Sequence, residues 1–132
     1  MIEYYIKEQE FKQFGENENK KRYFARIDEK TMLDTDELCQ RVADCSTLAK
    51  PEMRLAIDMA CDMIYEALKG GRSVRLGDLG VLHPTIKSKI CERKEDVTID
   101  TITDITCSIR LSEKLKKALR NEHVRKITLP NS

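Results

Sequence analysis

The segment from Pro51 to Lys69 has the strongest pattern in the chain, and it limits the fold more than any other feature. Its apolar residues recur every three or four positions, which predicts an amphipathic helix. The apolar face is wide enough to pack against two partners. Pro51 suits the start of such a helix, and Gly70 and Gly71 suit its end. We interpret the apolar positions as core: Leu55, Ala56, Met59, Ala60, Met63, Ile64, Ala67 and Leu68.

After this helix the apolar period changes to two, which predicts strands. Residues 73–76 and 81–90 form two short candidates joined by the sequence GDLG, and residues 91–96 form a charged turn. Residues 97–109 are rich in β-branched residues, but the alternation breaks between Ile99 and Ile102, so we expect a bulge or a bend there. Residues 112–120 predict a further helix, capped by Ser112.

The first part of the chain predicts two strands and a short helix. Residues 2–14 and 22–27 are strand-like and flank a polar turn, and such a pair must dock on other structure to be stable. Asp34 or Thr35 can cap a helix of about three turns. Residues 123–129 predict a terminal strand. We therefore expect an α+β fold, with residues 1–30 as a strand pair appended to a domain at 31–132.

Charge is unevenly distributed, although the net charge of the 132 residues is only +1. Residues 1–70 carry 11 Lys and Arg against 15 Asp and Glu, whereas residues 71–132 carry 13 against 8. A basic working face in the second half would give this asymmetry, and so would solvated charge without a function.

Five cysteines occur without a CxxC pair, and an odd number does not suit a disulfide framework. Free thiols in a reducing cytoplasm are the simplest interpretation. We find no basic-then-apolar signal region and no run near the roughly 18 apolar residues that a membrane span needs, so we expect no membrane association.

Three kinds of chemistry find little support in the sequence. GDLG lacks the Lys-Ser/Thr pair and the following helix of a phosphate loop, so its glycines fit a strand-to-strand turn better. The candidate metal ligands Cys91, Cys107, His83 and His123 are scattered rather than paired. No candidate nucleophile, such as a cysteine thiol, is accompanied by a recognisable general base. We expect no enzyme activity, no metal and no cofactor.

Nucleic-acid binding has a candidate surface on the predicted sheet. Lysines and arginines spaced along strands can follow phosphates without reading bases. An ordinary solvated sheet face would show the same pattern. The candidate residues are Arg75, Lys87, Lys89, Arg93, Lys94 and Arg110, with Lys116 nearby on the last helix.

Three stretches resemble the bacterial histone-like HU/IHF family. EALKGGRSVRLGDLGVL resembles its helix end, first strand and turn, and IRLSEKLKKAL resembles its return strand and last helix. KKRYFARI and SVRLGDLG (residues 73–80) match the HU-related variant common in Bacteroidetes, which carries an N-terminal strand pair. The resemblance extends from about Tyr4 to Leu129.

This resemblance implies an intertwined homodimer, with heterodimers among relatives as an alternative. Helices of both subunits would form the base, and a three-stranded antiparallel sheet from each would extend an arm to double-stranded DNA. In the family an arm-tip proline wedges between base steps. The resemblance therefore implies a nucleoid-associated protein of the cytoplasm that binds DNA with low sequence specificity.

The chain departs from the family in its arm. No proline occurs between Pro84 and Pro130, Leu82 replaces an aromatic residue, and three aspartates lie between residues 96 and 104. We therefore expect a shortened arm and weaker DNA bending. Two hypotheses remain: an HU-like DNA-binding protein, and a dimeric structural or interaction module of the same fold that has lost strong DNA binding.

Overall fold

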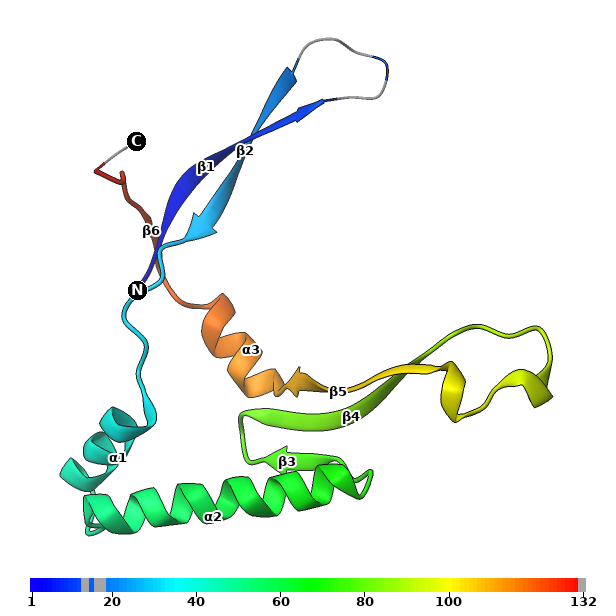
Figure 1. The fold of residues 1–132 in the computed structure, drawn as a ribbon. Coiled ribbons are helices and arrows are strands. Elements are labelled where there is room, and N and C mark those ends of the chain that lie inside the picture. The colour runs from blue at the N-terminus through cyan, green and yellow to red at the C-terminus, as the bar shows by residue number, and fades with distance from the viewer. Residues whose placement is uncertain (13–14, 16–18, 131–132) are drawn as a thin grey trace. The chain divides into compact units, whose positions relative to one another are not determined.

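The protein is described here by a computed structural model that covers residues 1–12, 15 and 19–130. The chain forms two compact units. The first comprises Met1–Met32 with Leu119–Ser132, and the second Leu33–Ala118. The described residues form three α-helices and two three-stranded sheets (Figure 1), which confirms the predicted α+β class. The division at residues 30 and 31 stays a prediction.

The first unit is built on the predicted strand pair. Strands β1 (Ile2–Lys12) and β2 (Asn19–Ile27) are antiparallel, with Tyr4 opposite Ile27 and Lys12 opposite Asn19. The predicted terminal strand is also present, as β6 (Val124–Lys126), and it pairs in parallel with β1. The strand order is β2-β1-β6. Residues from the two ends of the sequence therefore share one sheet, which gives the hairpin the third strand that it needs.

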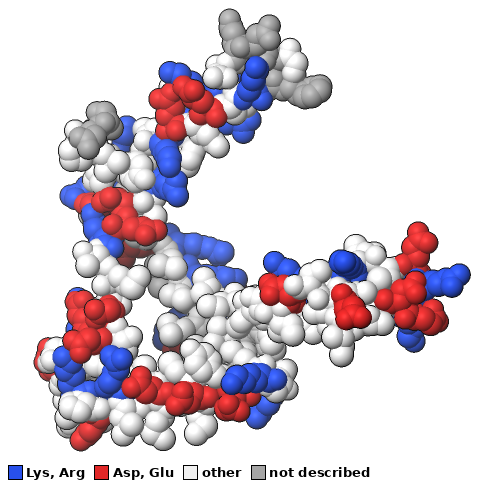
Figure 2. Space-filling view, in the orientation of Figure 1, with Lys and Arg blue, Asp and Glu red and all other residues white. Residues whose placement is uncertain are grey.

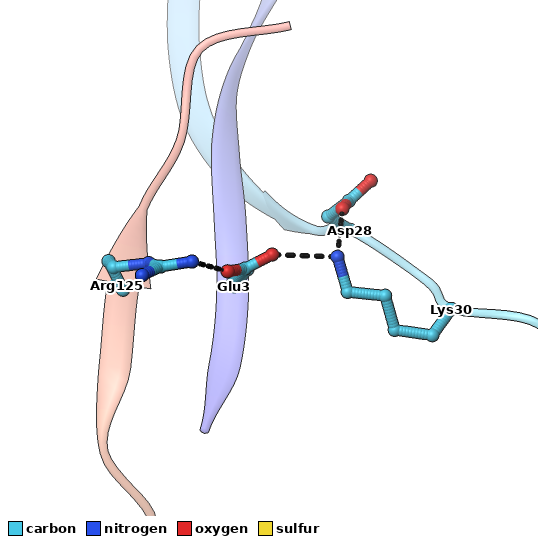
Figure 3. Close-up of polar contacts among 4 residues, drawn as sticks. All are labelled: Glu3, Asp28, Lys30 and Arg125. Atoms are coloured by element: carbon cyan, nitrogen blue, oxygen red, sulfur yellow. Dashed lines mark hydrogen bonds and ion pairs between the residues drawn. The ribbon is translucent and has the colours of Figure 1, made fainter.

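Glu3 links the three strands of this sheet at its base (Figure 3). Its carboxylate accepts hydrogen bonds from Arg125 in β6 and from Lys30 just after β2, the latter at 2.6 Å. Lys30 also binds Asp28 at 2.7 Å. The Glu3 side chain is only 16% exposed, so these charge-assisted bonds are less screened than those of a fully exposed pair.

The second unit begins with two helices whose ends follow the predicted signals. Helix α1 (Thr35–Asp44) is capped by Asp34, whose carboxylate accepts from the Glu37 N–H at 2.8 Å. Helix α2 (Lys50–Lys69) begins one residue before Pro51. At its end Gly71 has a φ of 80°, a conformation that favours glycine. The Arg72 N–H donates to the Ala67 carbonyl at 2.9 Å, which closes a Schellman cap.

The sheet of the second unit has the order β3-β4-β5 and is antiparallel, as predicted. Its strands are β3 (Val74–Leu76), β4 (Gly80–Ser88) and β5 (Ile102–Leu111). Since β3 pairs only with the first residues of β4, the remainder of β4 and β5 continues as a two-stranded arm (Figure 1). That this arm is shortened stays a prediction.

The predicted strands were too long at the far end of the arm. Strand β4 ends at Ser88 rather than at residue 90, and residues 99–101 form a 3-10 turn (η2, Ile99–Thr101) rather than a strand. The Thr101 hydroxyl donates to the Thr98 carbonyl at 2.7 Å and accepts from the Thr98 N–H at 3.2 Å. These local bonds compete with ladder pairing. They explain the break in alternation, for which a bend was one of the two expectations.

The GDLG turn joins β3 to β4 and is bound to the start of helix α3 (Glu113–Arg120). The Ser112 hydroxyl donates to the Asp78 carbonyl and accepts from the Leu115 N–H at 3.1 Å, so Ser112 is the predicted cap. The Ser112 N–H donates to the Leu79 carbonyl at 3.0 Å. The turn, the end of β5 and α3 are thus held by one residue.

Very little of this chain is buried. Among the described residues, Cys39 in α1 is the only hydrophobic residue in the fully buried class. Large apolar side chains remain exposed on α2, with Leu55 at 61%, Met59 at 52% and Met63 at 67%. Folded chains rarely leave so much large apolar surface in water without a use for it.

Gly80 generates the first testable prediction. A Cβ built at this residue would lie 2.3 Å from the Arg110 carbonyl oxygen, and its φ is 151°. The Gly80→Ala substitution must push β4 away from β5, so we expect the free energy of unfolding to fall by roughly 2–4 kcal/mol. Urea denaturation at one fixed protein concentration measures this loss.

Gly70→Ala is the matched control. A Cβ at Gly70 would meet only ordinary contacts, at 3.5 Å from the Ala67 carbonyl oxygen, and its φ is −82°. We expect it to change the free energy of unfolding by no more than about 0.5 kcal/mol. Equal losses in the two variants would contradict the role assigned to Gly80.

Candidate nucleic-acid interface

The β3-β4-β5 sheet has two chemically distinct faces. Residues directly opposite each other on antiparallel strands point to the same face, and the face alternates along each strand. One face is apolar except at the end of the arm, and it carries Val74, Leu76, Leu82, Pro84, Ile86, Ile105, Cys107, Ile109 and Leu111. The other is polar except at Val81, and it carries Arg75, His83, Thr85, Lys87, Asp104, Thr106, Ser108 and Arg110.

Two of the predicted binding residues lie in one row across the polar face. Arg75 in β3 is opposite Val81 in β4, and Val81 is opposite Arg110 in β5. Both arginines are exposed. The absence of a side chain at Gly80 lets β4 approach the Arg110 backbone closely, which fixes this row in register. Arg75 and Arg110 therefore present two guanidinium groups in the same row, one from each of the two strands that flank β4.

Lys87 lies farther out on the same face, but its cross-strand neighbour is acidic. Lys87 is opposite Asp104, and both side chains are exposed. Opposite charges at directly opposed positions attract each other, so Asp104 reduces the positive potential that Lys87 adds. Leu82, Pro84 and Ile86 of the same strand lie on the opposite, apolar face.

Sequence reasoning missed the hydroxyl groups between these cations. Thr85 is opposite Thr106, and His83 is opposite Ser108. Hydroxyl side chains contribute many of the contacts that proteins make with phosphates. Their signal was present in the alternation of β4 and β5 but carries no charge. His83 has a second role, since its Nδ1 lies 2.9 Å from the Ser73 hydroxyl, which joins β4 to the start of β3.

The three remaining arm residues lie at the tip, away from the strands. Lys89 follows β4, and its N–H donates to the Thr101 carbonyl at 2.9 Å. Arg93 precedes a 3-10 turn (η1, Lys94–Asp96), and Lys94 is the first residue of that turn. Carboxylates accompany them, and Figure 2 shows both signs of charge at the far end of the arm. The acidic residues of this segment are Glu92, Glu95, Asp96 and Asp100.

Lys116 is on α3 and is partly covered. Its ammonium lies 3.5 Å from the Glu113 carboxylate in the same helix. The neighbouring Lys114 binds Asp78 of the GDLG turn at 3.0 Å, so it adds to the junction around Ser112. The structure thus places Arg75, Lys87 and Arg110 on one face, Lys89, Arg93 and Lys94 at the tip, and Lys116 on α3.

The described part of the chain offers no alternative site of the kinds considered from the sequence. Within it, no three His, Cys, Asp or Glu residues gather closely enough to hold a metal ion. The five cysteines are free thiols, and only Cys39 is buried. None of the described helices combines the length and the hydropathy of a membrane-spanning segment.

Comparisons with known proteins agree with this architecture. Residues 1–126 match the HU-HIG family, described as an HU domain fused to wHTH, Ig, or glycine-rich motif. The structure is similar to that of a "putative bacterial DNA binding protein" from Bacteroides vulgatus ATCC 8482, with a TM-score of 0.67 and 16% sequence identity. That match covers 96% of this chain and 47% of the other, so this chain spans about half the length of its structural relative.

A second solved structure covers less of the chain. It is a mutant of HU from Thermotoga maritima, with a TM-score of 0.48 and 21% sequence identity, and the match covers 65% of this chain and 97% of the other. No curated protein matches the chain.

An HU domain is a non-enzymatic fold, in agreement with the expectation that the chain is not an enzyme. Since the family match extends over nearly all of the sequence, the chain belongs to the HU-HIG family of HU-domain proteins.

Proposed function

We propose that this protein binds double-stranded DNA through the phosphate backbone, with low sequence specificity, as a nucleoid-associated protein of the cytoplasm. The row formed by Arg75, Val81 and Arg110 carries the proposal, because it puts two exposed guanidinium groups on a polar face of fixed register. The contacting residues would be Arg75, Lys87, Lys89, Arg93, Lys94, Arg110 and Lys116. Membership of an HU-domain family supports the same function.

Backbone contact fits this surface better than base reading. Bidentate guanidinium groups and hydroxyls bind phosphate oxygens without distinguishing bases. The arm carries no proline beyond Pro84, so it has no wedge of that kind to insert between base steps. The outer part of the arm would attract phosphates less strongly, because Asp104 lies opposite Lys87 and further carboxylates lie at the tip. Binding would therefore depend mainly on the base of the sheet, and bending would be modest.

We also propose that two copies form the working unit. The Leu55, Met59 and Met63 stripe of α2 is more than half exposed, and burial of each such side chain is worth about 1.5–3 kcal/mol. The apolar sheet face is equally open, with Ile105 at 70% and Ile109 at 66% exposure. A second copy would cover both surfaces with identical ones, as two-fold symmetry requires. Heterodimers with relatives would use the same surfaces.

An apolar hollow adds to this argument. It has a volume of about 270 Å³ and lies between the apolar sheet face and α3. Apolar side chains from β3, the GDLG turn, β4, β5 and α3 surround it: Leu76, Leu79, Leu82, Ile109, Leu111 and Leu115. A hollow of this composition suits a large apolar side chain from a second chain.

The first prediction of this proposal concerns the salt dependence of DNA binding. Replacing Arg75 and Arg110 by Gln removes two phosphate contacts, so the slope of log K against log salt should become shallower by about 2 units. Fluorescence anisotropy with a duplex of about 30 base pairs, between about 50 and 200 mM salt, measures the slope.

The control is Arg54→Gln with Lys69→Gln, which removes the same charge from α2. Arg54 lies 3.5 Å from Asp58 and Lys69 lies 3.7 Å from Glu66, so both are paired within the helix. Their loss should leave the slope unchanged.

If neither the wild-type protein nor any variant binds duplex at low salt, the DNA-binding proposal fails, and the module without DNA binding takes its place. The opposition of Lys87 and Asp104 is the observation that favours this second candidate.

The second prediction concerns assembly. One chain has a mass of 15.3 kDa, and we expect sedimentation analysis to give about twice that value at micromolar concentration. Met59→Lys should shift the mass toward a single chain or unfold the protein, because it buries a charge in the proposed interface.

Asp58→Asn changes the net charge by the same amount on the polar side of α2 and should leave the dimer intact. A wild-type protein that sediments as a folded single chain would refute the assembly, whatever the variants do.

A further inference from the structure

The β1–β2 hairpin has a face that the proposed duplex site does not use. Directly opposed residues of the hairpin share a face, and one set contains cations and aromatic rings without a carboxylate. We call this set the basic–aromatic face: Tyr5, Lys7, Gln9, Phe11, Lys20, Arg22, Phe24 and Arg26.

The acidic residues in the described parts of β1 and β2 lie outside this set. Glu8 and Glu10 are opposite Tyr23 and Lys21, on the other face. Glu8 binds Lys21 there at 3.1 Å, and this hydrogen bond raises the pKa of Lys21. Glu3 is on the same side as the basic–aromatic face but lies at the base of the sheet, bound to Lys30 and Arg125. The register of the strands thus separates charges that look mixed along the sequence and in Figure 2.

Phe24 lies at the centre of this face and is surrounded by cations. Phe24 is 42% exposed. Lys7 is directly opposite, with a Cβ separation of about 5 Å. Arg22 and Arg26 lie two residues away on either side along β2, at a spacing of about 7 Å. An exposed ring framed by three cations can contact a flat base and the phosphates on both sides of it.

The neighbouring groups extend the same chemistry. The Arg22 guanidinium lies 3.6 Å from the centroid of the Phe11 ring. This cation–π contact holds the guanidinium against the hairpin. On the other side of Phe24, a hollow of about 350 Å³ is lined by Tyr5, Lys7 and Arg26, and it is closed by Ile27, Asp28 and Glu29. Such a hollow has room for a nucleotide.

We propose that the basic–aromatic face binds single-stranded nucleic acid, with an unpaired base stacked on Phe24 and phosphates bound by Lys7, Arg22 and Arg26. Cations alone would fit a duplex equally well. The exposed aromatic ring distinguishes the two, because paired bases hide their faces whereas unpaired bases stack on aromatic side chains. The proposal goes beyond duplex binding and does not require it.

The test uses the full chain and a fluorescent thymidine oligonucleotide of about 20 nucleotides, with the uridine oligoribonucleotide as a second probe to separate DNA from RNA. Phe24→Leu should weaken oligonucleotide binding about tenfold, since it removes a stack but keeps an apolar side chain. Tyr23→Leu is the matched control: Tyr23 is the adjacent aromatic residue, 65% exposed, on the opposite face, and its loss should have no effect.

A pair of charge variants gives an independent measurement. Arg22→Gln with Arg26→Gln should make the salt slope for the oligonucleotide shallower by about 1.4 units. Lys12→Gln with Lys21→Gln removes the same charge from the other face of the hairpin and should leave it unchanged. Circular dichroism of each variant establishes that the fold is retained.

Competition separates this site from the proposed duplex site. We expect the oligonucleotide to remain bound in the presence of saturating unlabelled duplex, and the Phe24→Leu protein to keep its duplex affinity. Complete displacement by duplex, equal losses in the Phe24 and Tyr23 variants, or equally strong binding of polyglutamate would each overturn the proposal. Failure of duplex binding alone would leave oligonucleotide binding intact, so the two proposals fail separately.

Discussion

The main physical constraint on this protein is that one chain cannot cover its own apolar surface. Cys39 is the only fully buried hydrophobic residue among those described, while Met63 of α2 and Ile105 of β5 are each about two-thirds exposed. Because a small domain has little stability beyond what apolar burial supplies, this exposure is the main physical support for the proposed assembly of two copies. The wide apolar face of α2 and the apolar face of the sheet are both available for this purpose.

The junction around Ser112 determines how the polar sheet face is presented. Its backbone and hydroxyl bind the GDLG turn on one side and cap α3 on the other. Gly80 allows the close approach of β4 to Arg110 that this junction requires. Arg75 and Arg110 therefore owe their common row to backbone contacts rather than to any attraction between side chains. The two arginines would repel each other if nothing else held the strands.

Much of the fold could be predicted from local pattern, whereas the site could be predicted only in part. The caps at Asp34 and Ser112 and the glycine end of α2 are local signals, and the structure confirms them. The 3-10 turn at Ile99–Thr101 was not predicted as such, because its threonine bonds leave no trace in hydrophobic alternation. Lys87 lies opposite Asp104 because of the register between β4 and β5. The two residues are 17 positions apart in the sequence, so a pattern of neighbouring residues could not predict this pair.

The sequence by itself determined the element types, the period change after Gly71 and the polar alternation of the sheet, because each depends on residues within a few positions of one another. Only the tertiary structure decided which charges share a face. Pairing between β1 and β2 gathers Lys7, Arg22 and Arg26 around Phe24 and sends Glu8 and Glu10 to the other side. Pairing of β6 with β1 brings Arg125 to Glu3, although 122 positions separate them. Side-chain alternation has a period of two, so register alone assigns every charge to its face.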